Sequence, residues 1–251
     1  MNIKPDSDIR VIVHISQPQS DYVTIESCEA VSLAAVSLAA FSEGLVSLNL
    51  VDCPNLTSIP ALPAGLRELC LVDCPALTAI PELPASLKSL IIEGCCLIRE
   101  LPKLPDALIE LTVDAATFAG PDQWPASLTS LWISAWAYVE NLQAFPDSLI
   151  DLKVSHCHSL KQLPKLPAKL KELTLSDCQG LENFPELHEG MTSVRVQDCP
   201  NLKNAPTPPA SLKFFLATGC PKLTEFAGIL DYVAWADNMV LAPRLEEGKT
   251  Q

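Results

Sequence analysis

The sequence is poor in aromatic residues and has no glycine-rich segment. Aromatic side chains make up 6% of the 251 residues, whereas hydrophobic residues of all kinds reach 48%. Leucine, alanine, valine and isoleucine must therefore form the core, in many small and similar layers rather than in one globular centre. The absence of a glycine-rich loop that could cradle phosphate groups removes the usual signature of a nucleotide-binding enzyme.

Positive charge is also scarce. Lysine and arginine number 17 against 30 aspartates and glutamates, which gives a formal net charge of −13. Such a surface repels phosphate groups, so the composition argues against a general nucleic-acid binder and against a protein drawn to anionic membranes. The charge suits a protein partner with a basic or mixed surface, although a solvated acidic surface without any partner explains it as well.

No segment has the pattern expected of a membrane span or of a secretory signal. Residues 1–15 lack a basic stretch followed by an apolar one. The apolar run over residues 30–41 is shorter than the roughly 20 residues needed to cross a bilayer. We expect this run to pack at the N-terminal end of the domain.

A repeat of 21 residues fills most of the chain. Its pattern is roughly L-x-x-L-x-L-x-x-C-x-x-L-x-x-L-P-x-L-P-x-x, and most of the 22 prolines fall at its fixed positions. The central L-x-L has the period of a strand, so its leucines should point inward and the residues between them outward. The proline doublet cannot continue a helix and predicts an extended return. Nine copies, 21 residues apart except for one step of 20, begin at Leu45, Leu66, Leu87, Leu108, Leu128, Leu149, Leu170, Met191 and Leu212.

These features predict one elongated, monomeric domain of the mainly β or α/β class. It should be a solenoid with ten parallel strands on one face and short proline-rich returns on the other. Residues 42–229 hold the nine repeats of 20–21 residues. Residues 1–41 should form an N-terminal cap, with a strand over residues 10–15 and a degenerate opening repeat over residues 23–31. Residues 230–251 lose the period and should form a C-terminal cap and tail.

The proline doublets at Ile59–Pro63, Leu101–Pro105 and Leu163–Pro167 resemble those of the leucine-rich repeat family. The repeat looks more specifically like the LPX-type repeats of effectors that Gram-negative pathogens inject into host cells, although similar short repeats also occur in other bacteria and in large viruses. The resemblance covers residues 42 to about 229. It implies a right-handed superhelix whose concave sheet binds a host protein, and a location in the bacterial cytoplasm and then in the host cytosol.

The sequence departs from the family pattern in two respects. The ninth repeat position carries cysteine, where the family usually has an asparagine that caps backbone groups. The effectors that it resembles often carry a ubiquitin-ligase domain with a catalytic cysteine after the repeats, whereas the 22 residues after Ile229 contain no cysteine. We therefore expect no ligase domain.

Ten cysteines at first suggest disulfides or a metal site. No C-x-x-C pair occurs, however, so we expect neither a metal nor another cofactor. Eight cysteines share one repeat position: Cys28, Cys53, Cys74, Cys95, Cys157, Cys178, Cys199 and Cys220. We predict that they form a ladder of buried, reduced thiols that donate to backbone carbonyls, which requires a reducing compartment. Cys70 and Cys96 lie off this cysteine ladder and should react first with thiol reagents.

The sequence offers no catalytic set. His156 and His158 flank Cys157, but neighbouring residues of a strand point to opposite faces, so this thiol and these imidazoles cannot meet easily. We predict a protein-binding module and not an enzyme. Two alternatives stay open: a repeat domain that recruits substrates for an associated enzyme, and a structural or adhesive repeat protein.

Six aromatic residues lie between Phe118 and Phe145, where the repeats are irregular. Trp124 and Phe145 replace inward leucines and Trp136 replaces a ladder cysteine, which favours repair of the core. Trp132 takes an outward strand position, which favours a binding surface. The predicted binding residues are Trp132, Ile91, Thr112, Lys153, Arg195, Glu68, Glu110, Asp151, Glu172, Phe118 and Tyr138.

Aspartate recurs at one position directly after the strands. The residues are Asp52, Asp73, Asp177 and Asp198. Because aspartate favours the turn at a strand exit, half of this recurrence is explained without a function.

Overall fold

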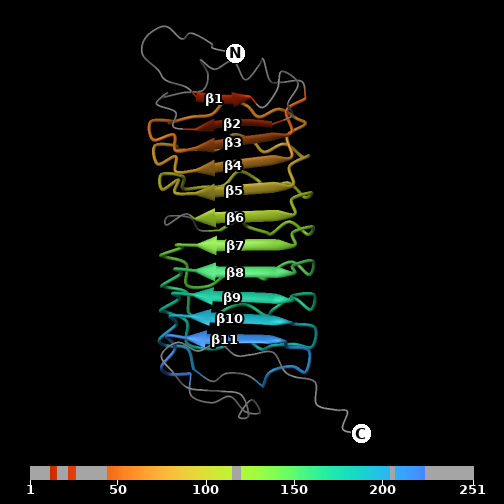
Figure 1. Cartoon of the computed structure of the whole chain (residues 1–251), viewed down its shortest axis with the longest axis vertical. Helices are drawn as coiled ribbons and strands as arrows, with labels where there is room; N and C mark the ends of the chain where they lie inside the picture. Colours follow the sequence, from red (N-terminus) through yellow and green to blue (C-terminus); the bar gives the residue numbers. More distant parts are fainter. Residues whose placement is uncertain (1–11, 16–21, 27–43, 115–119, 204–206, 224–251) are drawn as a thin grey trace.

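Eleven strands form one sheet in chain order in the computed structural model, which describes residues 12–15, 22–26, 44–114, 120–203 and 207–223 (Figure 1). They are β1 (Ile12–Ile15), β2 (Tyr22–Glu26), β3 (Ser47–Val51), β4 (Glu68–Val72), β5 (Ser89–Glu93), β6 (Glu110–Asp114), β7 (Ser130–Ser134), β8 (Asp151–Ser155), β9 (Glu172–Ser176), β10 (Ser193–Gln197) and β11 (Phe214–Thr218). Cys28, Phe118 and the predicted domain boundaries at residues 42 and 229 lie outside the described residues.

Each strand from β2 to β10 buries its second and fourth residues, as the leucine pattern predicts. In β4 these residues are Leu69 and Leu71, and in β8 they are Leu152 and Val154. The first, third and fifth side chains point away from the core, because successive side chains of a strand alternate. The proline-rich segments, such as residues 59–63, return the chain without regular secondary structure.

The strands from β2 to β11 pair in parallel and in register. In most pairs a residue meets the one 21 positions later, as Leu69 meets Leu90. Between β6 and β7 the step is 20, and Thr112 still meets Trp132. The missing residue of this repeat is therefore absorbed in its return segment, and the prediction of ten parallel strands is confirmed.

An eleventh strand departs from this pattern, because β1 pairs with β2 in the antiparallel direction. The sequence predicts a strand over residues 10–15 but does not give its direction. The cause is the length of the connection. Parallel neighbours need a crossover of about a dozen residues or more, whereas only residues 16–21 separate β1 from β2.

The core contains the aromatic residues that replace leucines or cysteine. Trp124, Trp136 and Phe145 are buried, which confirms that these three repair the core. The rings of Trp124 and Trp136 stack with a centroid distance of 6.3 Å and an interplanar angle of 17°. A large indole thus fills the space that a cysteine occupies in regular repeats.

The cysteine ladder is present in the described repeats. Its members are buried except for Cys220, which is half-buried, and all nine described cysteines are free thiols. Cys74 Sγ lies 3.5 Å from the carbonyl oxygen of Val72 and 3.8 Å from that of Leu50, in the preceding repeat. A hydrogen bond with the thiol of Cys157, together with burial, raises the pKa of Cys178 to about 12. The Cys178 thiol therefore stays protonated and serves as a backbone donor. The hydrogen bond with Cys178 lowers the pKa of the Cys157 thiol instead.

Serine at the last repeat position forms a second ladder, which the sequence analysis missed. The hydroxyls of Ser127 and Ser148 donate to the carbonyl oxygens of Leu108 and Leu128, each at 2.6 Å. Ser86 and Ser211 make the equivalent bonds to Leu66 and Met191. Each of these four hydroxyls joins the last residue of a repeat copy to the first residue of the same copy, just before the next strand begins. Within the part of the chain that the structure describes, no helix is long and apolar enough to cross a membrane.

Candidate protein-binding surface

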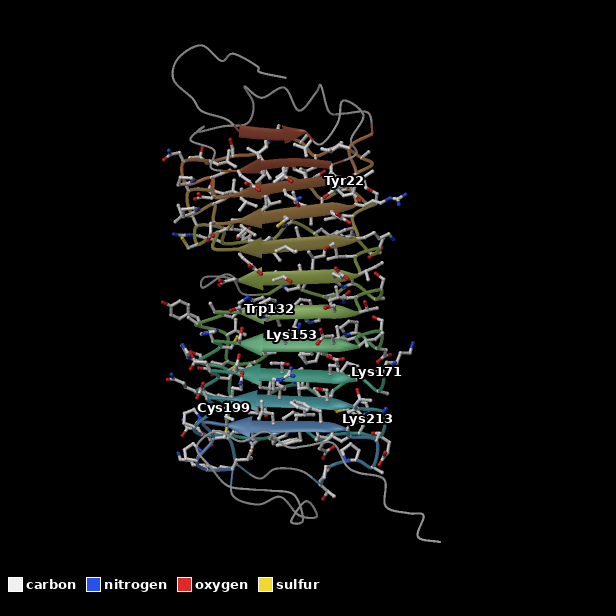
Figure 2. All side chains as sticks on the ribbon, viewed as in Figure 1. Tyr22, Trp132, Lys153, Lys171, Cys199 and Lys213 are labelled. Carbon is white, nitrogen blue, oxygen red and sulfur yellow. The ribbon has the colours of Figure 1, made fainter. Side chains whose placement is uncertain are left out.

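The outward side chains of β2 to β11 form one continuous surface, here called the sheet face. Trp132 is the third residue of β7 and lies near the middle of the stack (Figure 2). Its side chain is 40% exposed, although an indole is among the largest apolar groups available to a core. Folding therefore leaves a substantial apolar area in contact with water at this point.

The neighbouring strand β8 holds the indole in one orientation. Trp132 Nε1 donates to the buried hydroxyl of Ser155 at 3.2 Å. The Nζ atom of Lys153 lies 5.8 Å from the ring centroid, a cation–π distance, and 3.5 Å from a carboxylate oxygen of Asp151. The ring is thus fixed at its polar edge while much of its apolar surface stays open, so little side-chain entropy remains to be lost on binding.

Five of the predicted binding residues lie in one row across the strands, and four of them are direct neighbours. Ile91, Thr112, Trp132 and Lys153 are successive partners in the registers of β5 to β8. Arg195 is further away, on β10, where its guanidinium carbon lies 4.8 Å from the centroid of the Phe214 ring. Tyr138 is in the turn after β7 and not on the sheet face, and its side chain is 81% exposed.

The predicted acidic residues are first residues of their strands. They are Glu68 on β4, Glu110 on β6, Asp151 on β8 and Glu172 on β9. Asp151 pairs with Lys153, and Glu110 accepts a long hydrogen bond of 3.4 Å from Ser89. Glu68 and Glu172 are exposed and make no ion pair with another described residue. Their charge is available to a partner.

Comparison with known proteins supports the fold assignment through structure and not through sequence. No protein-family model matches the chain, and no curated protein matches it. The solved leucine-rich repeat domain of the type III effector XopL aligns with 91% of this chain and 78% of its own, at 23% identity and a TM-score of 0.52. The fold is a leucine-rich repeat solenoid. The predicted resemblance is thereby confirmed at the level of fold.

Two further solved leucine-rich repeat structures resemble this solenoid more distantly. YopM from Yersinia enterocolitica is 20% identical, with 73% of this chain and 57% of that chain aligned and a TM-score of 0.38. CroV588, a circular leucine-rich repeat protein, is 18% identical, with 69% and 33% aligned and a TM-score of 0.40. At these TM-scores, neither adds to the assignment.

The backbone conformation explains why aspartate recurs after the strands. Asp52, Asp73, Asp177 and Asp198 all have positive φ angles, between 49° and 52°. Aspartate and glycine tolerate this left-handed conformation better than most residues. The corresponding glycines, Gly94 and Gly219, have φ angles of 63° and 64° and could have revealed this rule in the sequence. The carboxylates still make the edge at the strand ends acidic.

Several charged groups act on Asp114, the last residue of β6, at this edge. Burial raises the pKa of the Asp114 carboxyl, and the Asp73 carboxylate adds to the effect. His156 and a hydrogen bond from the backbone N–H of Gly94 act in the opposite direction but only partly offset it. His156 itself lies 3.7 Å from an Asp177 carboxylate oxygen. Throughout the described ranges, no group of three or more histidine, cysteine or acidic side chains is arranged to hold a metal ion.

Three exposed apolar residues were missed in the sequence, namely Leu97, Ile109 and Ile150. A comparison of equivalent repeat positions could have found them. Ile109 and Ile150 stand where other repeats carry Arg67, Lys88 or a threonine, and Leu97 is equivalent to Tyr138. The repeat pattern predicts only which positions are buried, and these residues occupy positions that the pattern leaves free.

Proposed function

We propose that this leucine-rich repeat solenoid is a protein-binding module and that its sheet face binds a partner around Trp132. The observation that carries the proposal is the exposed indole, which Ser155 and Lys153 hold in a fixed orientation. An exposed aromatic group of this size gains little from folding, whereas aromatic side chains near the centre of an interface commonly dominate binding energy.

The surroundings of Trp132 fit this role. Ile91 and Thr112 lie in the same row and extend the contact along the stack. Glu68, Glu110 and Glu172 provide an acidic column for a partner with a basic or mixed surface, while Lys153 and Arg195 provide positive charge on the C-terminal side. Charges at the rim of an interface act mainly on association rate and specificity.

We further propose that the solenoid is an effector that acts on a host protein in a reducing compartment such as the host cytosol. The support is indirect. XopL, which shares the fold, is described as a type III effector, and the nine described cysteines of this chain are free thiols.

The test is affinity capture from eukaryotic lysate with matched variants. Trp132→Ala should abolish capture of the specific partner by costing about 2 kcal/mol or more of binding energy. Thr174→Ala, at the equivalent position of β9, should leave capture unchanged. Both variants should melt within a few degrees of the unsubstituted protein. A strong loss of thermal stability with Trp132→Ala and unchanged capture would show that the indole serves the fold alone.

A further inference from the structure

The large apolar side chains that the described part of the solenoid exposes are concentrated between the levels of β5 and β8. They are Tyr22, Leu97, Ile109, Trp132, Tyr138 and Ile150. All except Tyr22 belong to the region from the end of β5 to the start of β8. Scattered exposed apolar residues need no explanation, whereas a cluster in one part of a repeat protein does.

These five residues lie at three successive places along the strand direction: before the strands, in the middle of a strand and beyond the strand ends. Ile109 and Ile150 directly precede β6 and β8, Trp132 is in the middle of β7, and Leu97 and Tyr138 each lie four residues beyond the end of a strand. Together they define a surface that we call the transverse band. It runs from Ile109 and Ile150, before the strands, past Trp132 to Leu97 and Tyr138, in the turns beyond the strand ends. A five-residue strand covers about 16 Å, so the band is about as wide as a short extended peptide segment is long.

The start of the band is held rigidly by the backbone. The N–H of Thr129 donates to the carbonyl oxygen of Ile109 at 2.8 Å, and the N–H of Ile150 donates to that of Thr129 at 2.8 Å. These hydrogen bonds fix the backbones of Ile109 and Ile150 relative to each other, with Thr129 between them. The indole of Trp132 is also oriented, by its bond to Ser155. A segment that binds here therefore contacts side chains that are already oriented, so little conformational entropy of the solenoid is lost on binding.

Residues above and below the band on the sheet face are more polar. In the row that contains Trp132, the apolar Ile91 lies two strands before it, whereas Thr112 is its direct neighbour on β6. Lys153, Thr174 and Arg195 follow Trp132, so the row is polar in the C-terminal direction. A segment that ran along the stack would leave the apolar surface after one or two repeats. A segment that ran across the sheet would meet Ile109 or Ile150 before the strands and Trp132 in the middle, and would reach Tyr138 only where it passes the turn beyond β7.

The strand-end side of the band is acidic. Asp114 pairs with Ser134, two residues after Trp132, and Glu93 ends the adjacent strand β5. The environment of Asp114 disfavours its negative charge, because the carboxylate is partly desolvated and close to Asp73. A cation from a partner would favour the charged carboxylate by electrostatic attraction. At the strand-start side the charges are mixed, since Lys88 and Glu110 are both exposed there.

We infer that the transverse band binds an extended segment of a partner protein that lies across the sheet, with apolar side chains on Ile109, Trp132 and Tyr138 and a lysine or arginine beside Glu93 and Asp114. This inference deepens the proposed function and rests on it. A second copy of the chain fits less well, because the net charge of −13 makes two copies repel each other.

The test uses a phage-displayed library of random fifteen-residue segments, selected on the full chain. The selected segments should share large apolar residues and a basic residue towards one end. For the strongest segment, fluorescence anisotropy should show affinity losses of about fivefold or more with Ile109→Ser, Tyr138→Ser and Trp132→Ala. Thr192→Ser and Asn55→Ser change the equivalent repeat positions far from the band and should alter affinity by less than about twofold. Asp114→Asn should weaken binding and flatten its salt dependence.

The outcomes separate the two proposals. Losses with Trp132→Ala, Asn49→Ala and Arg195→Ala but not with Ile109→Ser or Tyr138→Ser would place the segment along the stack, which overturns this inference and keeps the proposed function. Unchanged affinity in every variant, including Trp132→Ala, would overturn both. A library without enriched segments overturns the inference, as does a dimer in sedimentation experiments that Ile109→Ser dissociates.

Discussion

Individual thiols of the protein differ in access and in acidity. Cys96 is exposed, whereas Cys70 is half-buried, and burial followed by the Glu93 carboxylate raises the pKa of Cys70. Because the thiolate is the nucleophile that attacks thiol reagents, native protein at about pH 8 should label at Cys96 first, at Cys70 more slowly, and at the buried ladder only on unfolding. Mass spectrometry of a labelling time course would measure this order. Cys96→Ser should remove the fast phase, and rapid labelling of Cys74 or Cys178 would contradict the ladder.

Asp114 connects stability with pH. Its folded-state pKa is raised, so the fold disfavours the charged carboxylate, and the stability that this group contributes at low pH is lost as the pH rises through the folded pKa. Asp114→Asn should therefore raise the melting temperature at neutral pH, and the difference should vanish below about pH 3, where both side chains are neutral. Thermal melts at the two pH values would test this. A lower melting temperature at neutral pH would show that the hydrogen bond from Gly94 outweighs the desolvation.

At the scale of the element, the serine ladder stabilises the turns before four of the strands. The Ser148 hydroxyl ends one repeat copy and lies 2.6 Å from the carbonyl oxygen of Leu128, which begins that copy. Ser148→Ala removes this donor and should cost about 1 kcal/mol of unfolding free energy, measured by urea denaturation. Ala107, at the equivalent position of another repeat, offers the reverse experiment, in which Ala107→Ser should stabilise. Equal stability of the Ser148→Ala variant would mean that water replaces the hydroxyl without cost.

The strands and their register were predictable because the leucine period fixes which side chains point inward, and in-register stacking then follows. The outward position of Trp132 on β7 follows from the same alternation. The antiparallel direction of β1 did not follow, because it depends on a connection outside the period. The left-handed backbone at Ala135 was also hidden, since alanine does not favour that conformation. Exposure at Leu97 and Ile109 depends on what packs over the edges, which the period does not encode.

At the scale of the whole molecule, each repeat contacts mainly its two neighbours, so the solenoid should tolerate removal of one complete copy. Excision of residues 66–86 joins Gly65 to Leu87 and keeps the period, so a cooperative but less stable fold should remain. Excision of residues 66–80 removes a strand without its return, shifts the phase and should disrupt the stack. Circular dichroism and urea denaturation of both variants would test this. Equal damage from the two deletions would show that the stack folds as one indivisible unit.

The 20-residue copy that still pairs in register has a genetic consequence. Neighbouring repeats are similar in sequence, so the coding DNA offers many sites for unequal recombination, and in-frame gain or loss of a copy joins segments that still stack. Small deletions within a return segment are also tolerated, as the copy beginning at Leu108 demonstrates. A gene of this type can therefore change the length of its product without first destroying the fold. Each such event would insert or delete one whole strand of the sheet face. Selection can therefore act on a new recognition surface in a single mutational step.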